Sequence, residues 1–230
     1  MKFALRQFAT VAVLLALFVV PAFGGPPLVC HTFDIGDAKS LPWISHNWNL
    51  TGTESYNTKN LPADTLAILD SESTVLVHME TLRRTALYGQ KDPDALKQLL
   101  LRLVARDDAS RNTHDFALAT FDVGYLAAIL AQVHWINKSF ANPAEGLDPY
   151  SLVKQALELR PNDAQMQFAA ALITLDGPAS DHYQHSQKTL AGAKTDPLLA
   201  RNLSTHFVSP QSETMAELIS RNTNVKVAQP

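Results

Sequence analysis

The chain has 230 residues, with 19 lysines and arginines against 22 aspartates and glutamates, which gives a formal net charge of −3. Basic residues are not clustered, and because phosphate binding needs clustered lysine and arginine, the composition argues against a nucleic-acid partner. The single cysteine, Cys30, cannot form an internal disulfide, although it could bridge to a partner or to a second copy.

The first 24 residues have the three-part pattern of a secretory signal peptide. Two basic residues precede an apolar run over 8–20, which is shorter than the ~20 residues of a membrane-spanning helix. Ala22 and Gly24 place small residues at the two positions that a signal peptidase reads. We therefore expect cleavage after Gly24 and export to the periplasm or the medium; an uncleaved anchor is the alternative.

Residues 25–60 form an aromatic-rich segment that lacks helical periodicity. We expect an extended N-terminal arm that runs across the surface of the helices, with turns at Gly36 and Pro42. The apolar side chains expected to pack this arm are Phe33, Ile35, Leu41, Trp43, Ile44 and Trp48.

The stretch "LVCHTFDIGDAKSLPWISHNW", residues 28–48, also raises the possibility of a metal or redox site. The candidate ligands are Cys30, His31, Asp34, Asp37 and His46. Attached haem needs two cysteines, and a zinc site usually needs four ligands, often including paired cysteines, which are absent here. Adjacent residues also rarely both bind one ion. We therefore favour packing, and expect no metal and no cofactor. A second possible metal pair is His182 and His185, with His206 as a third ligand.

Residues 61–222 read as one helical domain, followed by a loose tail, residues 223–230. The clearest helix covers 92–108, because Asp92 can cap it, Pro93 suits its first position, and leucines repeat at helical spacing. The same Asp-Pro opening recurs at 148–149 and 196–197. Further helices are expected over 62–89 with interruptions, 163–177, 181–194 and 212–222. No segment alternates like a strand, so almost no sheet is expected.

The segment 114–138 is predicted to be the central helix of the domain. Its only formal charge between Phe116 and Asn137 is Asp122, and polar residues within it would be costly in lipid, so burial among helices is favoured over a membrane span. A stripe of mostly small residues would let a second helix approach closely. Its members are Ala117, Phe121, Gly124, Ala128 and Ala131.

Asp122 and Tyr125 are the candidates for a buried polar or ligand contact. A buried carboxylate is costly unless it is paired, so Asp122 either faces a pocket as a general base or bonds a structural partner. The structural partner could be a neighbouring helix end or an arginine such as Arg83, Arg84 or Arg111. Motifs for nucleophilic catalysis, zinc proteases and phosphate-binding loops are absent, so we expect no catalytic residues and no enzyme activity.

Residues 148–203 resemble tetratricopeptide repeats. In "ALELRPNDAQMQFAAALITLDG", Ala156 and Pro161 have the spacing of a repeat junction, and Ala171 lies where the next helix needs a small residue. The interval between Gly192 and Pro197 repeats that spacing, whereas Gln167 replaces a large aromatic residue. The resemblance implies packed helical hairpins with a concave surface that binds a peptide or partner protein, without chemistry of its own.

The sequence thus predicts an exported, all-α protein of tetratricopeptide-like or α-solenoid-like hairpins. Its predicted function is non-catalytic binding or scaffolding of a peptide, a protein or an envelope component. The alternative is an exported metal- or redox-linked protein that uses Cys30 and nearby histidines, and a third possibility is an enzyme that uses Asp122 and Tyr125. Neither a nucleic acid nor a stable membrane span after signal cleavage is expected.

Overall fold

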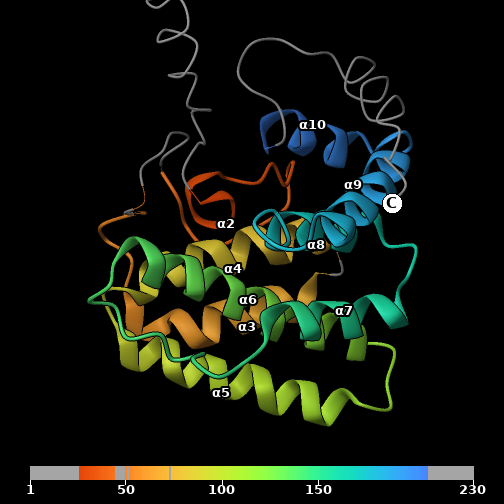
Figure 1. Cartoon of the computed structure of the whole chain (residues 1–230). Helices are drawn as coiled ribbons and strands as arrows, with labels where there is room; N and C mark the ends of the chain where they lie inside the picture. The colour runs from red at the N-terminus through yellow and green to blue at the C-terminus, as the bar shows by residue number, and fades with distance from the viewer. Residues whose placement is uncertain (1–25, 45–49, 51, 73, 207–230) are drawn as a thin grey trace, which may run out of the picture.

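The computed structural model describes residues 26–44, 50, 52–72 and 74–206 (Figure 1). The predicted signal peptide, the predicted helix 212–222 and the predicted tail lie outside these residues. The described part of the chain contains helices and no strands, which confirms the all-α prediction. The elements are α2 Pro27–Cys30, η2 Thr58–Asn60, α3 Leu61–Ser71, α4 Val75–Gly89, α5 Pro93–Ser110, α6 Phe116–Ile136, α7 Pro149–Leu159, α8 Ala164–Ile173, α9 Ala179–Ala193 and α10 Pro197–His206.

The helix starts follow the capping residues in the sequence. The Asp92 carboxylate accepts a hydrogen bond from the amide of Ala95 (3.1 Å), and Asp148 caps α7 in the same way. Asp163 accepts from two amides of α8, and Asp196 accepts from the first free amides of α10. These carboxylates satisfy amides that have no partner inside the helix, so the predicted helix starts are confirmed.

Helix α6 is the central helix, as predicted. It lies among α4, α5 and α7 (Figure 1), and it is the one helix of the described chain that is long and apolar enough to cross a membrane. Within its most apolar window, 83% of the residues are buried inside the protein. A helix that is apolar on every side is characteristic of a protein interior as well as of a membrane span.

Gly124 shows why α7 can lie so close to α6. A Cβ atom at this position would stand 2.7 Å from the Cβ of Leu152 and 3.0 Å from the carbonyl oxygen of Pro149, both on α7. The predicted close approach of a second helix is therefore confirmed at Gly124. Ala131, the last member of the predicted stripe, is exposed and takes no part in the buried packing.

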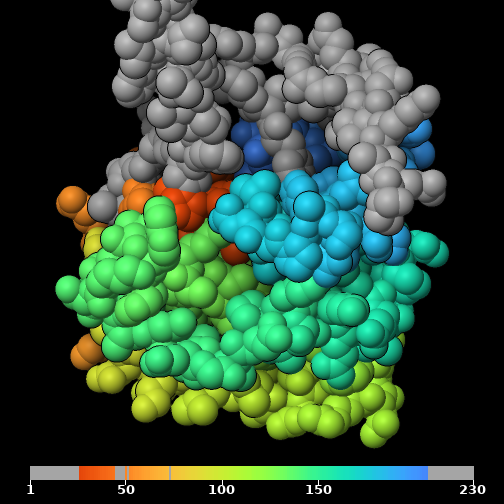
Figure 2. All heavy atoms as spheres, viewed as in Figure 1, coloured from red at the N-terminus to blue at the C-terminus, as the bar shows by residue number. Residues whose placement is uncertain are grey.

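The N-terminal segment is more deeply embedded than a surface arm. Leu28, Val29, Phe33 and Leu41 are each at most 3% exposed, and the first three belong to the main hydrophobic core. The segment lies between α4 and α10 (Figure 1), and Figure 2 shows it lodged between the green and the blue helices. The predicted packing of Ile44 is wrong, because this side chain is 72% exposed, and Trp48 lies outside the described residues.

Candidate functional site

Asp122 is the centre of a buried polar network that joins four helices. Its carboxylate on α6 is fully buried and contacts His78 Nδ1 of α4 at 2.6 Å and Arg106 Nη1 of α5 at 2.7 Å. Arg106 also donates from Nε to Asp70 of α3 at 2.9 Å. The expectation of a structural partner that is an arginine is confirmed, but the arginine is Arg106 rather than Arg83, Arg84 or Arg111. The second partner, His78 of α4, was not expected.

The hydrogen bonds of His78 identify it as an imidazolium. Its Nε2 lies 3.0 Å from the carbonyl oxygen of Glu72, which can only accept, and its Nδ1 faces the Asp122 carboxylate, so we assign a proton to both nitrogens. Burial alone would lower the pKa of His78, but the charge of Asp122 and the hydrogen bonds to Asp122 and Glu72 raise it above 6.5. In this state both N–H groups of His78 are engaged within the protein, and the pair joins α4 to α6.

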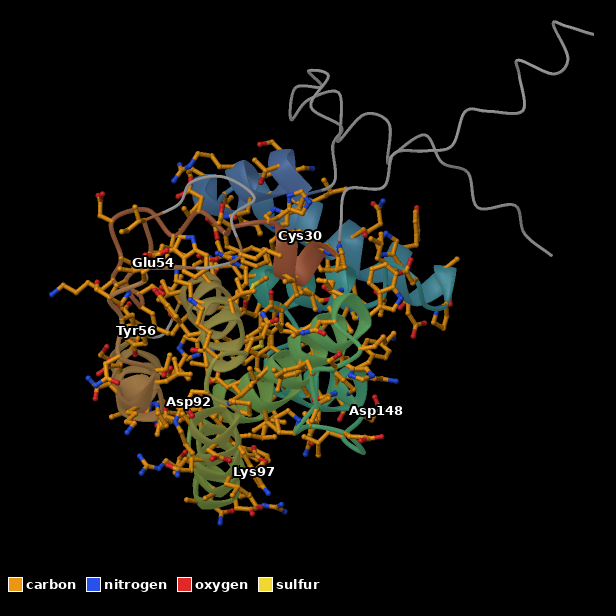
Figure 3. The ribbon with its side chains drawn as sticks, turned by 90° about the vertical axis from the view of Figure 1, so that its left-hand side faces the viewer. Cys30, Glu54, Tyr56, Asp92, Lys97 and Asp148 are labelled. Atoms are coloured by element: carbon orange, nitrogen blue, oxygen red, sulfur yellow. The ribbon has the colours of Figure 1, made fainter. Side chains whose placement is uncertain are left out.

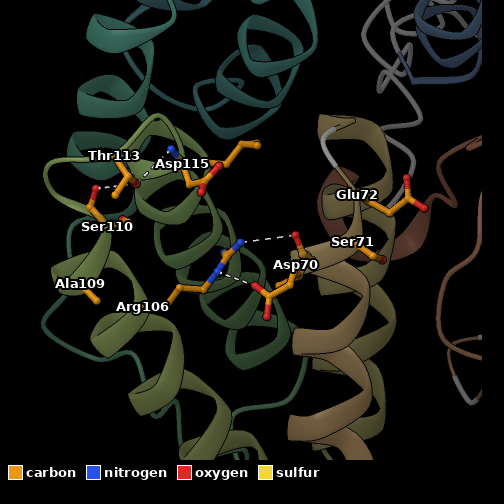
Figure 4. Close-up of a pocket in the computed structure, with 10 residues that line it drawn as sticks. Asp70, Ser71, Glu72, Arg106, Ala109, Ser110, Thr113 and Asp115 are labelled. Atoms are coloured by element: carbon orange, nitrogen blue, oxygen red, sulfur yellow. Dashed lines mark hydrogen bonds and ion pairs between the residues drawn. The ribbon is translucent and has the colours of Figure 1, made fainter.

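A pocket of about 560 Å³ lies over this network, between α3, α5 and α6 (Figure 4). Arg106 lines the pocket and reaches Asp70, which also lines it, whereas Asp122 does not line it. The guanidinium group of Arg106 is committed to Asp70, Asp122 and the carbonyl oxygen of Leu69. The cationic side chain that lines this pocket, Arg106, is thus already paired with two carboxylates of the protein.

Tyr125 is not brought together with Asp122 in one site. It is fully buried, and its ring stacks on Phe121 with centroids 5.3 Å apart. No described residue forms a hydrogen bond with its hydroxyl oxygen. Burial, and secondly the charge of Glu80, raise the pKa of Tyr125 well above 10. Its neutral phenol therefore acts as a core side chain.

The Cys30 region does not assemble the metal site considered from the sequence. Cys30 is a half-buried free thiol on α2 (Figure 3), and burial raises its pKa above 9.0. His31 approaches His206, with ring centroids 5.4 Å apart, whereas Asp34 pairs with Arg201. His46 lies outside the described residues. Among the residues that the structure describes, no three histidine, cysteine or acidic side chains are placed to hold a metal ion.

The pair His182 and His185 makes hydrogen bonds within the protein. His182 Nδ1 contacts the carbonyl oxygen of Ala171 at 2.9 Å, and His185 bridges Gln167 (2.6 Å) and the hydroxyl of Tyr150 (2.9 Å). His185 lines a pocket of about 300 Å³ between α7 and α9. The two histidines do not converge with His206, which stacks on Phe33 beside α2 instead.

A different group of residues, which the sequence did not reveal as a site, holds the N-terminal strap, defined here as residues 26–43. On α4, buried Glu80 accepts from Arg83 Nε and Nη2 at 2.8 and 2.9 Å and from Arg84 Nε at 2.7 Å. Each of the three side chains also bonds a main-chain atom of the strap. These contacts are Glu80 to Phe33 N (3.0 Å), Arg83 to Val29 O (3.1 Å) and Arg84 to Leu41 O (2.5 Å).

Three further side chains form hydrogen bonds with the main chain of the strap. Asn202 of α10 accepts from the amide of Asp34 and donates to the carbonyl oxygen of the same residue, both at 2.8 Å. Gln132 of α6 accepts from the amide of Leu28 at 2.9 Å. Tyr88 of α4 donates its hydroxyl to the Pro42 carbonyl oxygen. The strap is therefore held by its main chain at several separate points.

One pattern in the sequence could have indicated this cluster. In "VLVHMETLRRTALYG", Glu80, Arg83 and Arg84 have the i, i+3, i+4 spacing of one helix face, within an otherwise largely apolar helix. That spacing is also common on solvent-exposed helices, so only the burial of Glu80 and Arg83 distinguishes the cluster.

The chain matches no protein-family model, no curated protein and no solved structure.

Proposed function

We propose that this protein is an exported, non-catalytic helical module that binds a peptide or a segment of a partner protein. The observation that carries the proposal is the grip of buried side chains on the main chain of the strap. Hydrogen bonds to main-chain N–H and C=O groups give affinity for an extended chain, and pockets for its side chains give specificity. The contacts that α4 and α10 make with the strap include both main-chain hydrogen bonds and buried apolar side chains.

The C-terminal hairpins support the same proposal. Helices α6 and α7 pack closely, as do α8 and α9, and a Cβ atom at Gly192 would lie 2.1 Å from the Cβ of Ala164. Such tight packing of consecutive helices at small residues is consistent with an arrangement similar to tetratricopeptide repeats, which act by binding. We propose that arrangement for residues 148–203.

The state of the buried network also favours binding over catalysis. Asp122 and His78 have their polar atoms engaged with each other, with Arg106 and with the Glu72 carbonyl oxygen. An acid–base group needs a reacting partner within hydrogen-bonding reach, and here those positions are already taken. We assign the network to stability.

Export is tested by the native mass of the protein from the exported fraction, measured without reductant. The proposal expects a monomer of residues 25–230 with no added mass. An added metal mass, or a dimer that reductant splits, would instead make Cys30 the centre of function and support the metal- or redox-linked alternative.

Binding is tested with an unbiased array of linear peptides and the purified full-length exported chain. We expect a subset of sequences to bind reproducibly and to be competed by the same peptides free in solution. An array on which no sequence exceeds the background of an unrelated helical protein would overturn the proposed function, whatever the site.

A further inference from the structure

We propose that the strap is the resident occupant of the peptide site, and that the ligand binds by displacing it. The site is the strap groove, formed by α4, α6, α8 and α10 around residues 26–43. Its ligand is a peptide with two adjacent aliphatic residues in a short helical turn, as Leu28 and Val29 have in α2. An extended stretch follows, with an aromatic residue four positions after the second aliphatic one, as Phe33 follows Val29. This inference rests on the proposed function and assigns its site.

The polar groups of the groove bond main-chain atoms of the strap rather than its side chains. The Asn202 amide pairs with both the N–H and the C=O of Asp34, which is how a neighbouring strand would pair with it. Arg83 and Glu80 bond the strap at a carbonyl oxygen and an amide that any residue other than proline could provide. These contacts do not depend on the identity of the strap side chains.

Apolar pockets provide the selectivity. Leu28 and Val29 are each 1% exposed and Phe33 is 3% exposed. The Phe33 ring stacks on His206 (centroids 4.6 Å apart, rings 9° from parallel) and meets Phe168 of α8 edge-on at 6.0 Å. Asp34, between these anchors and the next turn, is exposed, so a ligand needs matching anchors but is less constrained there.

An empty groove would leave polar groups of α4 with fewer hydrogen bonds than an occupied one. Glu80 and Arg83 are buried with the strap in place, and without it each would lose one main-chain partner. Glu80 and Arg83 still pair with each other without the strap, but a buried group that loses a hydrogen bond is costly, so exchange of one chain for another is favoured over simple opening.

The strap leaves part of the groove unfilled. A pocket of about 560 Å³ lies beside it, between the strap, α4 and α10, and is lined by Phe33, Trp43, Arg84 and Thr205 among others. A peptide with larger side chains than Ile35 and Gly36 at the equivalent positions would gain contacts there that the strap does not make. Those contacts give a separate peptide a means of competing with a tethered one.

The test uses a fluorescent peptide with the sequence of residues 26–43 and the purified full-length chain. Because the strap is tethered, it holds the wild-type groove closed, and apparent affinity falls with the fraction of open groove. The variant Phe33→Ala weakens the strap without substituting any residue of α4, α6, α8 or α10. We expect it to bind the peptide at least about tenfold more tightly than wild type in an anisotropy titration.

Two variants define the site. Leu101→Ala removes an apolar side chain that is 62% exposed on α5, and should leave peptide binding at the wild-type level. Adding Asn202→Ala to Phe33→Ala should remove the gain, because Asn202 holds the main chain of the occupant. A scrambled peptide of the same composition should not bind. Equal affinities for wild type and a folded Phe33→Ala variant would overturn the inference.

Hydrogen exchange on the wild-type chain gives a second test that needs no substitution. The amides of Phe33 and Asp34 are bonded to Glu80 and Asn202, so we expect both to exchange faster when the unlabelled peptide is in excess. Unchanged protection at both amides would overturn the inference. If array peptides bind but neither Phe33→Ala nor exchange responds, the proposed function stands and its site lies elsewhere.

Discussion

Replacing Asp122 by asparagine tests the assignment of the buried network to stability. The substitution keeps the size of the side chain but removes the negative charge that faces His78 and Arg106. The new amide can accept from one of these groups, while its NH2 group points a donor at the other. A buried cation is then left without its counter-charge on α6.

The expected loss is large because the network is buried. Asp122 and His78 are both 0% exposed and Arg106 is 21% exposed, so solvent compensates little. Breaking one partner of a buried ion pair costs roughly 3–5 kcal/mol. For a chain of this size each kcal/mol lowers Tm by about 2–4 °C, so a fall of about 6–20 °C is expected.

The pH dependence makes the prediction sharper. The pKa of His78 is higher in the folded protein than its unfolded value of 6.5. Its contribution to stability is therefore complete below pH 6.5 and is lost as the pH rises through the folded pKa. The difference in the free energy of unfolding between wild type and Asp122→Asn should be largest below pH 6.5 and shrink at alkaline pH, leaving the contribution of Arg106.

Urea denaturation followed by circular dichroism, across that pH range, measures both effects. The matched control is Asp108→Asn, which breaks a pair with Arg111 whose side chains are 60% and 64% exposed, and it should cost at most about 1 kcal/mol. An Asp122→Asn variant within 1 kcal/mol of wild type at every pH would refute a charged buried pair, and with it the imidazolium assignment.

Three further changes test other parts of the structure, each by thermal melting and urea titration. Tyr125→Phe removes a buried hydroxyl that no described residue bonds, so stability should be unchanged or rise by about 1 kcal/mol; a loss of that size would show that the hydroxyl has a partner. Gly124→Ala should destabilise the fold by about 1–3 kcal/mol, because its Cβ would stand 2.7 Å from that of Leu152, and an unaffected Tm would contradict the close approach of α7. Asp92→Ala should cost about 1 kcal/mol through the lost cap on Ala95, and Asp92→Asn, which can still accept that hydrogen bond, should lose less.

The strap groove changes how the N-terminal region is understood. In the sequence, Cys30 and His31 are its conspicuous residues, but in the structure the anchors are the neighbouring Leu28 and Val29. Its polar contacts use main-chain atoms, which are the same for every sequence. The reactive side chains of this region therefore do not indicate its contacts, which several buried polar side chains make with its main chain.

Local features determined the helices. Asp92 and Asp148 each provide an oxygen at the position where free amides begin, and the following proline suits the first turn, so these starts can be read from neighbouring residues alone. The apolar character of 116–136 likewise predicted a buried central helix. Such properties depend on residues a few positions apart, which the sequence contains in full.

The partners of the polar residues were decided by tertiary structure. Arg83 and Arg106 each lie among apolar residues in a predicted helix, yet Arg106 meets Asp122 and Arg83 meets the strap. Which arginine pairs with Asp122 depends on how α4 and α5 are rotated about their axes and placed against α6. The packing of many apolar contacts together sets this arrangement. For the same reason, the sequence alone determined that Asp122 would be buried, and only the fold decided that it meets His78 and Arg106 and that the strap packs against Glu80 and Arg83.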